Sequence, residues 1–404
     1  MNLDLPAERR RVNRLLALAP WLLITADGRA KGPPDHPPVD LRAVSGGHVS
    51  AVGSAVVNGA AMFLPFQRFD GSNGLARIES DLTIGPVCEL PARAHDVTPT
   101  PSGQTLLVME RRPGRRAWIV DAASCRLVSQ FEAGAGRHFE GHATFTSDGR
   151  LLTTENDYEH GRGVIGVRDS IRYQWLGELD SHGVGPHELK LKPDGKTLVV
   201  ANGGVLTHPD RPGEKLNLDT MRSTLTYLDI DSGRRLSEWH SPHPKLGIRH
   251  IDVAATGEVV IGMQFEGNWG SEGLPLLARH DGQNPLRFPS APDHVWVPWS
   301  GYVGSIRLAA DRPLACATSP RGGLYMLWDL ATNRLGPARS MPDVCGTDFG
   351  PGGELIVSSG DGRIRRHGSD SKLPEATLDV AGRHWDNHLR YLISGTTARR
   401  PADA

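Results

Sequence analysis

Short stretches of alternating apolar and polar residues recur along most of the chain, and each one ends in a turn. From position 142 onward, four successive segments follow this pattern: HATFTSD, RLLTTEN, GVIGVRD and YQWLGEL. A period of two is typical of β-strands, whose side chains point alternately to opposite faces. Asp148-Gly149 and Asp194-Gly195 stand where strands must reverse, because glycine adopts a positive φ without steric cost. The pattern predicts antiparallel sheets joined by tight turns.

A single phrase opens four of these predicted sheets: a histidine, an alternating strand and a turn glycine. It reads AHDVTPTPSG at His95, GHATFTSDG at His142, PHELKLKPDG at His187 and RHIDVAATG at His250. The histidines are roughly 45 residues apart, with one longer interval. Repeats of this length, made of short strands, are typical of β-propeller blades.

Three further copies bring the number of predicted inner strands to seven. Ser305 and Thr347 replace the histidine in two of them, and His388 restores it in the last. The stretch from Gly46 to Leu90 supplies outer strands without an inner one, whereas His388 supplies an inner strand with little chain after it. Joining the two closes a ring without an exposed edge. We therefore predict an all-β fold, a seven-bladed β-propeller over residues 46–395 closed by a C-terminal inner strand, with a tail at 396–404.

The segment before the propeller has a different character. Arg9, Arg10 and Arg11 precede an apolar run from Leu15 to Ile24, and the Pro-rich KGPPDHPPVD follows. This arrangement resembles a bacterial Tat export signal, and the apolar run is too short to span a membrane. We predict an export signal over 1–30, a Pro/Gly-rich linker over 31–45, and a periplasmic mature protein without a membrane span. An amphipathic or disordered leader is the alternative interpretation.

Propeller geometry predicts that the histidines gather at one mouth of the central channel, together with polar residues that follow the second strands. Imidazoles with nearby carboxylates suit a transition metal such as iron or copper. The candidate metal ligands are His95, His142, His187, His250, His388, Glu155 and Asp157. The other candidates at the channel mouth are Glu110, Asn156, Asn202, Gln264 and Arg321.

The histidines also have a purely structural interpretation. In WD-repeat propellers a Gly-His pair before the inner strand packs and forms hydrogen bonds, and Gly141-His142 resembles that pair. The polar neighbours differ from blade to blade, however, whereas a purely structural repeat should reuse one partner. This difference favours a functional role.

Composition excludes several function classes. The chain has 404 residues and a formal net charge of −1, so no general attraction to nucleic acid or to an anionic membrane is expected. The pair Arg111-Arg112 is interpreted as a solvated face. No P-loop, dinucleotide fingerprint or G-x-S-x-G motif occurs. Of the four cysteines, Cys88 and Cys125 are compatible with a disulfide or with two buried thiols, and Cys345 is placed beside the channel.

Several longer segments resemble a bacterial propeller family catalogued as domain of unknown function 1513. They include RHFEGHATFTSDGRLLTTENDYEHGRGVIGVRD, GPHELKLKPDGKTLVVANGGVLTHPD and, near the end, WDNHL. The resemblance covers about residues 90 to 325. It implies an exported seven-bladed propeller, often encoded beside imelysin-type proteins and a di-haem thiol oxidoreductase-like protein in clusters that suggest iron uptake. It supplies no catalytic residue.

Three hypotheses follow. The first is a periplasmic, monomeric binding module that holds a transition metal or a metal-bearing partner and assists iron acquisition together with imelysin-like and di-haem oxidoreductase-like proteins. The second is a metal-dependent enzyme, either a redox enzyme or a lactonase-like hydrolase, the latter requiring Glu155 and Asn202 to converge on the axis. The third is a protein-interaction scaffold with structural histidines, in which an insertion at 204–224 forms the contact surface.

Overall fold

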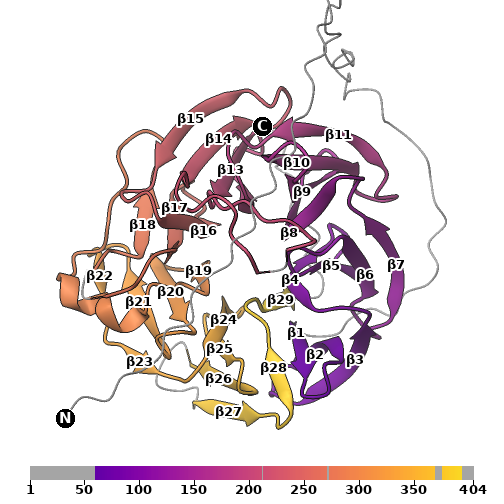
Figure 1. Ribbon diagram of the computed structural model, residues 1–404. Coiled ribbons are helices and arrows are strands. Elements are labelled where there is room, and N and C mark those ends of the chain that lie inside the picture. Colours follow the sequence, from indigo (N-terminus) through magenta and orange to yellow (C-terminus); the bar gives the residue numbers. More distant parts are fainter. Residues whose placement is uncertain (1–59, 212, 271–272, 369–374, 394–404) are drawn as a thin grey trace, which may run out of the picture. The chain divides into compact units, whose positions relative to one another are not determined.

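Seven antiparallel sheets are arranged around a common axis as the blades of a β-propeller (Figure 1). The computed structural model describes residues 60–211, 213–270, 273–368 and 375–393. The all-β fold and the number of blades are confirmed. The predicted export signal over 1–30, the linker over 31–45 and the tail over 396–404 lie outside the described residues.

Blades 2, 3 and 4 each consist of four consecutive strands, from the channel outward. Blade 2 comprises β4 (Ala94–Pro99), β5 (Thr105–Glu110), β6 (Arg116–Asp121) and β7 (Leu127–Glu132). Blade 3 comprises β8 (Arg137–Phe145), β9 (Arg150–Asp157), β10 (Arg162–Asp169) and β11 (Trp175–Asp180). Blade 4 comprises β12 (Pro186–Leu191), β13 (Thr197–Asn202), β14 (Thr224–Asp229) and β15 (Arg235–His240). The insertion at 204–224 therefore connects β13 to β14.

Blades 5 and 6 are less regular, whereas blade 7 again has four consecutive strands. Blade 5 comprises β16 (Leu246–Val253), β17 (Val259–Phe265) and β18 (Leu277–His280), and two 3-10 helices follow it, η1 (Asp293–Val295) and η2 (Val297–Trp299). Blade 6 comprises β19 (Ser305–Leu308), β20 (Leu314–Ser319), β21 (Leu324–Asp329), β22 (Arg334–Leu335) and β23 (Arg339–Ser340). Blade 7 comprises β24 (Val344–Phe349), β25 (Leu355–Ser359), β26 (Arg363–His367) and β27 (Ala376–Asp379).

Blade 1 combines strands from both ends of the described chain. Its outer strands are β1 (Ala60–Arg68), β2 (Asn73–Glu79) and β3 (Ile84–Leu90), and its inner side is formed by β28 (Arg383–Trp385) and β29 (Arg390–Ile393). Both late strands pair with β1, at Phe66↔Trp385 and at Met62↔Tyr391. The predicted closure by the C-terminus is confirmed. The closing strand is interrupted at residues 386–389, which leave the ladder next to the channel.

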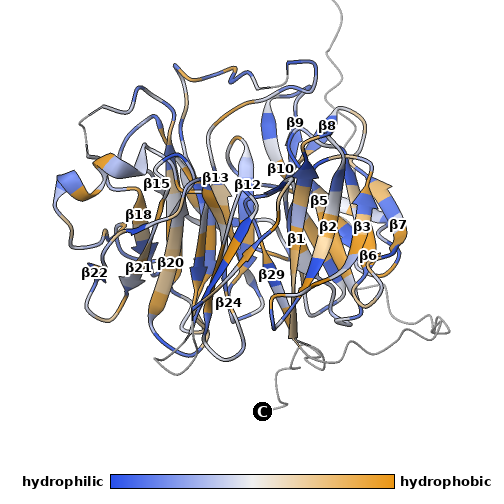
Figure 2. Cartoon of the chain, turned by 90° about the horizontal axis from the view of Figure 1, so that it is seen from below, coloured by the Kyte–Doolittle hydropathy of each residue, from blue (hydrophilic) through white to orange (hydrophobic). Residues whose placement is uncertain are grey.

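Apolar side chains fill the spaces between neighbouring blades and drive the assembly of the ring. Figure 2 shows the hydrophobic residues concentrated along the strands. The second strand β9 is buried along its whole length, whereas the outermost strand β7 is largely exposed. Cys88 and Cys125 share one of these apolar clusters as free thiols, so the disulfide that the sequence left open is not formed. Cys345 is buried against the closing segment, with Sγ 3.3 Å from the carbonyl oxygen of Asp386.

The inner strands bulge where the repeated histidine lies. The register between inner and second strand shifts at four comparable places: between Ala94 and Val97, between Phe139 and Ala143, between Pro186 and Glu188, and between Ile248 and His250. A β-bulge leaves a residue without a direct partner and re-aims its side chain. His95, His142 and His187 lie among the residues that these bulges leave without a ladder partner, whereas in β16 the unpaired residue is Arg249, directly before His250.

Candidate functional site

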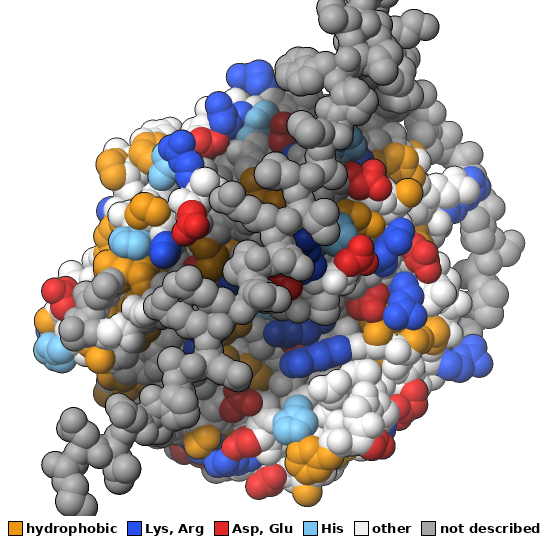
Figure 3. Space-filling view, viewed as in Figure 1, with side chains coloured by type: hydrophobic (Ala, Val, Ile, Leu, Met, Phe, Trp, Pro, Cys, Tyr) orange, Lys and Arg blue, Asp and Glu red, His pale blue; other side chains and the backbone are white. Residues whose placement is uncertain are grey.

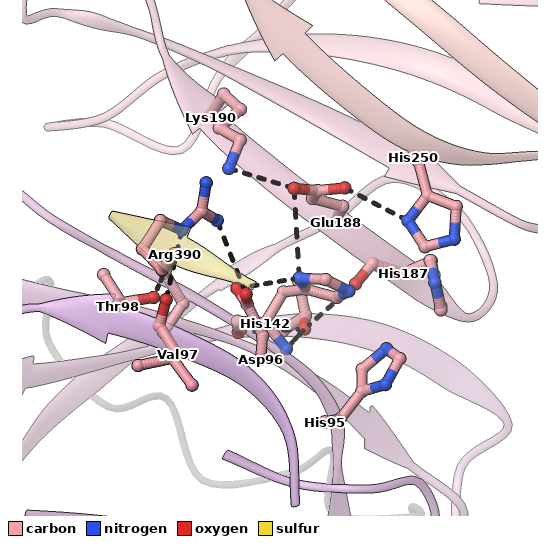
Figure 4. Close-up of polar contacts among 12 residues, drawn as sticks. His95, Asp96, Val97, Thr98, His142, His187, Glu188, Lys190, His250 and Arg390 are labelled. Atoms are coloured by element: carbon pink, nitrogen blue, oxygen red, sulfur yellow. Dashed lines mark hydrogen bonds and ion pairs between the residues drawn. The ribbon is translucent and has the colours of Figure 1, made fainter. Parts of the chain in front are cut away.

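Five imidazole rings from five consecutive blades form one compact group at the channel. We call His95, His142, His187, His250 and His388 the histidine cluster; Figure 4 labels the first four of them. Taken in sequence order, the rings form a closed circuit whose neighbouring centroids are 4.7 to 5.1 Å apart. Each residue is at most 8% exposed. Blades 6 and 7, which carry Ser305 and Thr347 at the equivalent positions, contribute no ring.

Three of the rings are each held by a carboxylate from the preceding blade. The Nδ1 atom of His95 lies 3.2 Å from Asp386, and that of His142 lies 3.1 Å from Asp96. The Nδ1 atom of His250 lies 3.4 Å from Glu188 (Figure 4). A carboxylate on Nδ1 fixes the orientation of an imidazole and leaves Nε2 free, which is the usual support of a metal-bound histidine.

Basic side chains keep these buried carboxylates ionised. Burial alone would raise the pKa of Asp386, but Arg111, His95 and Arg93 hold it well below its ordinary value. The Arg93 Nε and Arg111 Nη1 atoms donate to this carboxylate at 2.6 and 2.7 Å. An ionised carboxylate only accepts hydrogen bonds, so the His95 nitrogen that faces it carries the proton.

Nearby cations also keep the carboxylates of Asp96 and Glu188 ionised. Burial opposes their ionisation, but the charge of Arg390 on Asp96, and of Lys190 on Glu188, holds both pKa values well below the ordinary range. Arg390 lies 3.4 Å from Asp96, and Lys190 lies 2.9 Å from Glu188 (Figure 4). Arg307 adds a further cation 3.5 Å from Glu188.

Four of the five histidines are neutral at neutral pH. Burial lowers the pKa of His95 and of His250 to about 4, and lowers the pKa of His187 and His388 well below 6.5. Among the described residues, Nε2 of His142 and of His250, and both ring nitrogens of His187 and His388, have no hydrogen-bond partner. A buried polar atom left unpaired costs about 1–3 kcal/mol. Six such atoms, on four of the five rings, lie within the histidine cluster.

The cluster contains two sets of three residues that could each hold a metal ion. One set is His95, His142 and His388, and the other is His142, His187 and His250; within each set the candidate ligand atoms lie within 4.8 Å of one another. Three histidines that each offer one ring nitrogen are a common ligand set for a transition metal. His142 belongs to both sets and is therefore the central residue.

Most of the other candidate residues contact groups outside the histidine cluster. Glu155 forms an ion pair with Arg168 at 2.6 Å, and neither of the metal sets includes Glu155 or Asp157. The remaining candidates have these partners: Asp157 with His160 and Arg162, Glu110 with Arg115 and Arg116, Asn156 with His138 and with Thr207 of the 204–224 insertion, and Asn202 with Ser181, Thr224 and Thr226. Glu155 and Asn202 thus have partners outside the histidine cluster, although Oε2 of Glu155 and Oδ1 of Asn202 have no hydrogen-bond partner among the described residues.

A polar cavity of about 150 Å³ borders the histidine cluster. Its lining residues are His95, Arg111, Arg112, Glu140, His187, Arg249, His250, Gln264, Tyr302 and Asn387. Gln264 thus lies at this cavity, while Arg321 is exposed and stacks on Tyr302, with its guanidinium carbon 4.5 Å from the ring centroid. The interpretation of Arg111-Arg112 as a solvated face is wrong: both side chains turn toward the channel, where Asp386 and Glu140 attract them.

The residues that support the rings were not predicted from the sequence. Asp96 and Glu188 directly follow a cluster histidine, and Asp386 precedes His388 by two positions. An acid beside the repeated histidine was therefore the available signal. It was not decisive because each carboxylate contacts the ring of the next blade, and only the closed fold shows that pairing.

Comparison with known proteins gives a family but no activity. Among the described residues, no helix is long and apolar enough to cross a membrane. The search among curated proteins found no match. Residues 88–392 match the family described as protein of unknown function (DUF1513), and since this range covers most of the 404 residues, the chain belongs to that family.

Proposed function

We propose that this propeller binds one transition metal ion in the histidine cluster. The observation that carries the proposal is the set of buried, unpartnered ring nitrogens, together with the ionised carboxylates that orient three of the rings. Metal ligation uses neutral imidazole, and the lowered histidine pKa values provide that form at neutral pH. Three imidazoles would hold the ion, with His142 as a ligand in either arrangement.

Iron is the occupant that we propose first, with copper as the chemical alternative. Imidazole suits both metals, so the donor set alone does not choose between them. The resemblance to an exported propeller family encoded beside iron-uptake proteins favours iron. In this proposal the protein is a periplasmic binding module for iron acquisition, and its partners are imelysin-like and di-haem oxidoreductase-like proteins.

The direct test is elemental analysis of protein purified without an affinity tag. We expect near-stoichiometric metal in the wild type and a loss of at least about 90% in His142→Ala/His187→Ala, because this double change disrupts both metal sets. The matched control is His240→Ala/His294→Ala, which removes two exposed histidines outside the cluster. The control should keep its metal.

The fold of each variant must be checked beside its metal content. Circular dichroism and size-exclusion chromatography should show a folded double variant, with a stability loss of about 1–3 kcal/mol from the broken His142–Asp96 hydrogen bond. A folded double variant with unchanged metal would refute the proposal. So would a wild-type protein that neither contains nor takes up iron or copper.

A further inference from the structure

The cavity beside the histidine cluster is rich in arginine. Arg111 and Arg112 follow β5, and Arg249 lies on β16 directly before His250. Tyr302 and Asn387 also line the cavity. Figure 3 shows basic side chains near the centre of the face seen in Figure 1. A hollow lined by guanidinium groups favours an anionic occupant.

Ion pairs within the wall do not neutralise it. Arg112 pairs with Glu140 at 3.0 Å, and Asp386 is shared between Arg93 and Arg111. Glu266 is likewise shared between Arg249 and Lys215, the latter from the 204–224 insertion. These five cations, of which Arg111, Arg112 and Arg249 line the cavity and Arg93 and Lys215 lie behind it, outnumber the three carboxylates by two positive charges.

Arg249 is a buried arginine of the wall whose hydrogen-bond donors are only partly used. Its side chain is 2% exposed, and its Nη2 atom donates to Glu266 at 2.8 Å. Its Nε and Nη1 atoms are buried and have no partner among the described residues. Gly203 makes room for this guanidinium, since a Cβ there would lie 2.8 Å from Nη1. A buried guanidinium with unused donors is costly unless an acceptor completes it.

We propose that this cavity binds a small dianionic oxyanion, held by Arg249 and Arg111 next to the histidine cluster. The excess of two positive charges matches a dianion, and the cavity volume of about 150 Å³ corresponds to about five water molecules in the liquid. Dicarboxylates and phosphate share this chemistry. We also propose that the anion contacts the metal, and this second part rests on the proposed function. Anion binding by the two arginines does not depend on a bound metal.

The test measures anion binding to the metal-free, full-length protein by isothermal titration calorimetry. The probes are malonate and inorganic phosphate, with the uncharged malonamide as the matched control ligand. We expect one anion per protein and no binding of malonamide. The stronger of the two anions identifies the source, carboxylate or phosphate.

Two variants connect the binding to the arginines. Arg249→Gln/Glu266→Gln removes the guanidinium together with its buried partner, and Arg111→Gln leaves Asp386 paired with Arg93. Each should weaken anion binding at least tenfold. Arg235→Gln, at an exposed arginine that pairs with Glu238 on the outer strand β15, is the control and should bind as the wild type does.

The inference fails if neither anion binds, if malonamide binds as well as malonate, or if the folded arginine variants bind as the wild type does. Metal content, measured separately on the same preparations, keeps the two proposals apart. Anion binding to a protein that takes up no metal would support the arginine site while refuting the metal proposal. Metal uptake without anion binding would do the reverse.

Discussion

His142 and His187 occupy equivalent positions in neighbouring blades but form different interactions. The ring of His142 donates to Asp96, belongs to both metal sets and is 1% exposed. The ring of His187 belongs to one set only, and neither of its nitrogens has a hydrogen-bond partner among the described residues. Replacing each ring by an apolar side chain therefore removes different interactions.

We expect His142→Leu to abolish metal binding and His187→Leu to retain it, because the second variant still has His95, His142 and His388. In the metal-free protein, His142→Leu should lower the free energy of unfolding by about 1–3 kcal/mol, since Asp96 loses a partner. His187→Leu should change it by less than about 1 kcal/mol or raise it, since it removes an unsatisfied polar group. Chemical denaturation and elemental analysis measure both effects. Equal metal loss in the two variants would contradict the central role of His142.

The sequence predicts the ring-forming residues but not their supports. The histidines recur at one position of a repeat, and a repeat places equivalent positions at equivalent points around an axis. The carboxylates and arginines follow no such repeat, and their partners lie in other blades. Glu155 illustrates the limit: its place after a second strand pointed to the channel, but the buried guanidinium of Arg168 in its own blade binds it instead.

At the scale of the strand, the bulge in β8 interrupts the pairing with β9 and lets the side chain of His142 point toward the channel. Gly141 occupies this bulge with φ +107°, and a Cβ there would lie 2.6 Å from Cδ2 of His95. The missing side chain therefore lets two neighbouring blades bring their rings together. Alternation predicted the strands of this blade, but the bulge was not predicted, because one extra residue hardly alters a period-two pattern.

Gly141→Ala should be destabilising for two reasons, the positive φ and the clash with His95. Gly149→Ala is the matched control, because Gly149 has φ +90° but only one neighbour near its Cβ position, at 3.8 Å. Backbone strain of this kind costs about 1–3 kcal/mol, and we expect Gly141→Ala to cost at least about 1 kcal/mol more than the control. Thermal or chemical denaturation of the two variants gives the difference. Equal losses would mean that His95 does not need the space.

At the scale of the whole molecule, burial of neutral histidines makes stability depend on pH. The pKa values of His95 and His250 are about 4 in the folded protein, whereas exposed imidazoles in the unfolded chain titrate near 6.5. Between these values the unfolded chain binds more protons, so acidification favours unfolding. His187 and His388 act in the same direction.

We therefore expect the metal-free protein to lose stability as the pH falls from about 6.5 toward about 4. Each fully buried neutral histidine contributes a slope of about 1.4 kcal/mol per pH unit across this interval. Urea denaturation at about pH 7 and about pH 5 measures the loss. His95→Gln/His250→Gln, which cannot titrate at these positions, should show a shallower dependence. Stability that stays level or rises on acidification would contradict the burial of neutral rings.

Because the C-terminal strands close the ring, the histidine cluster is completed only after these strands have been synthesised. Asp386 and His388 belong to the segment that completes blade 1, so the circuit of five rings contains residues from near the end of the chain. A chain still being synthesised has the rings of blades 2 to 5 but lacks the fifth ring and the carboxylate that orients His95. The complete cluster therefore forms only after β28 and β29 have paired with β1, and a ligand that requires all five rings would bind only to the closed ring.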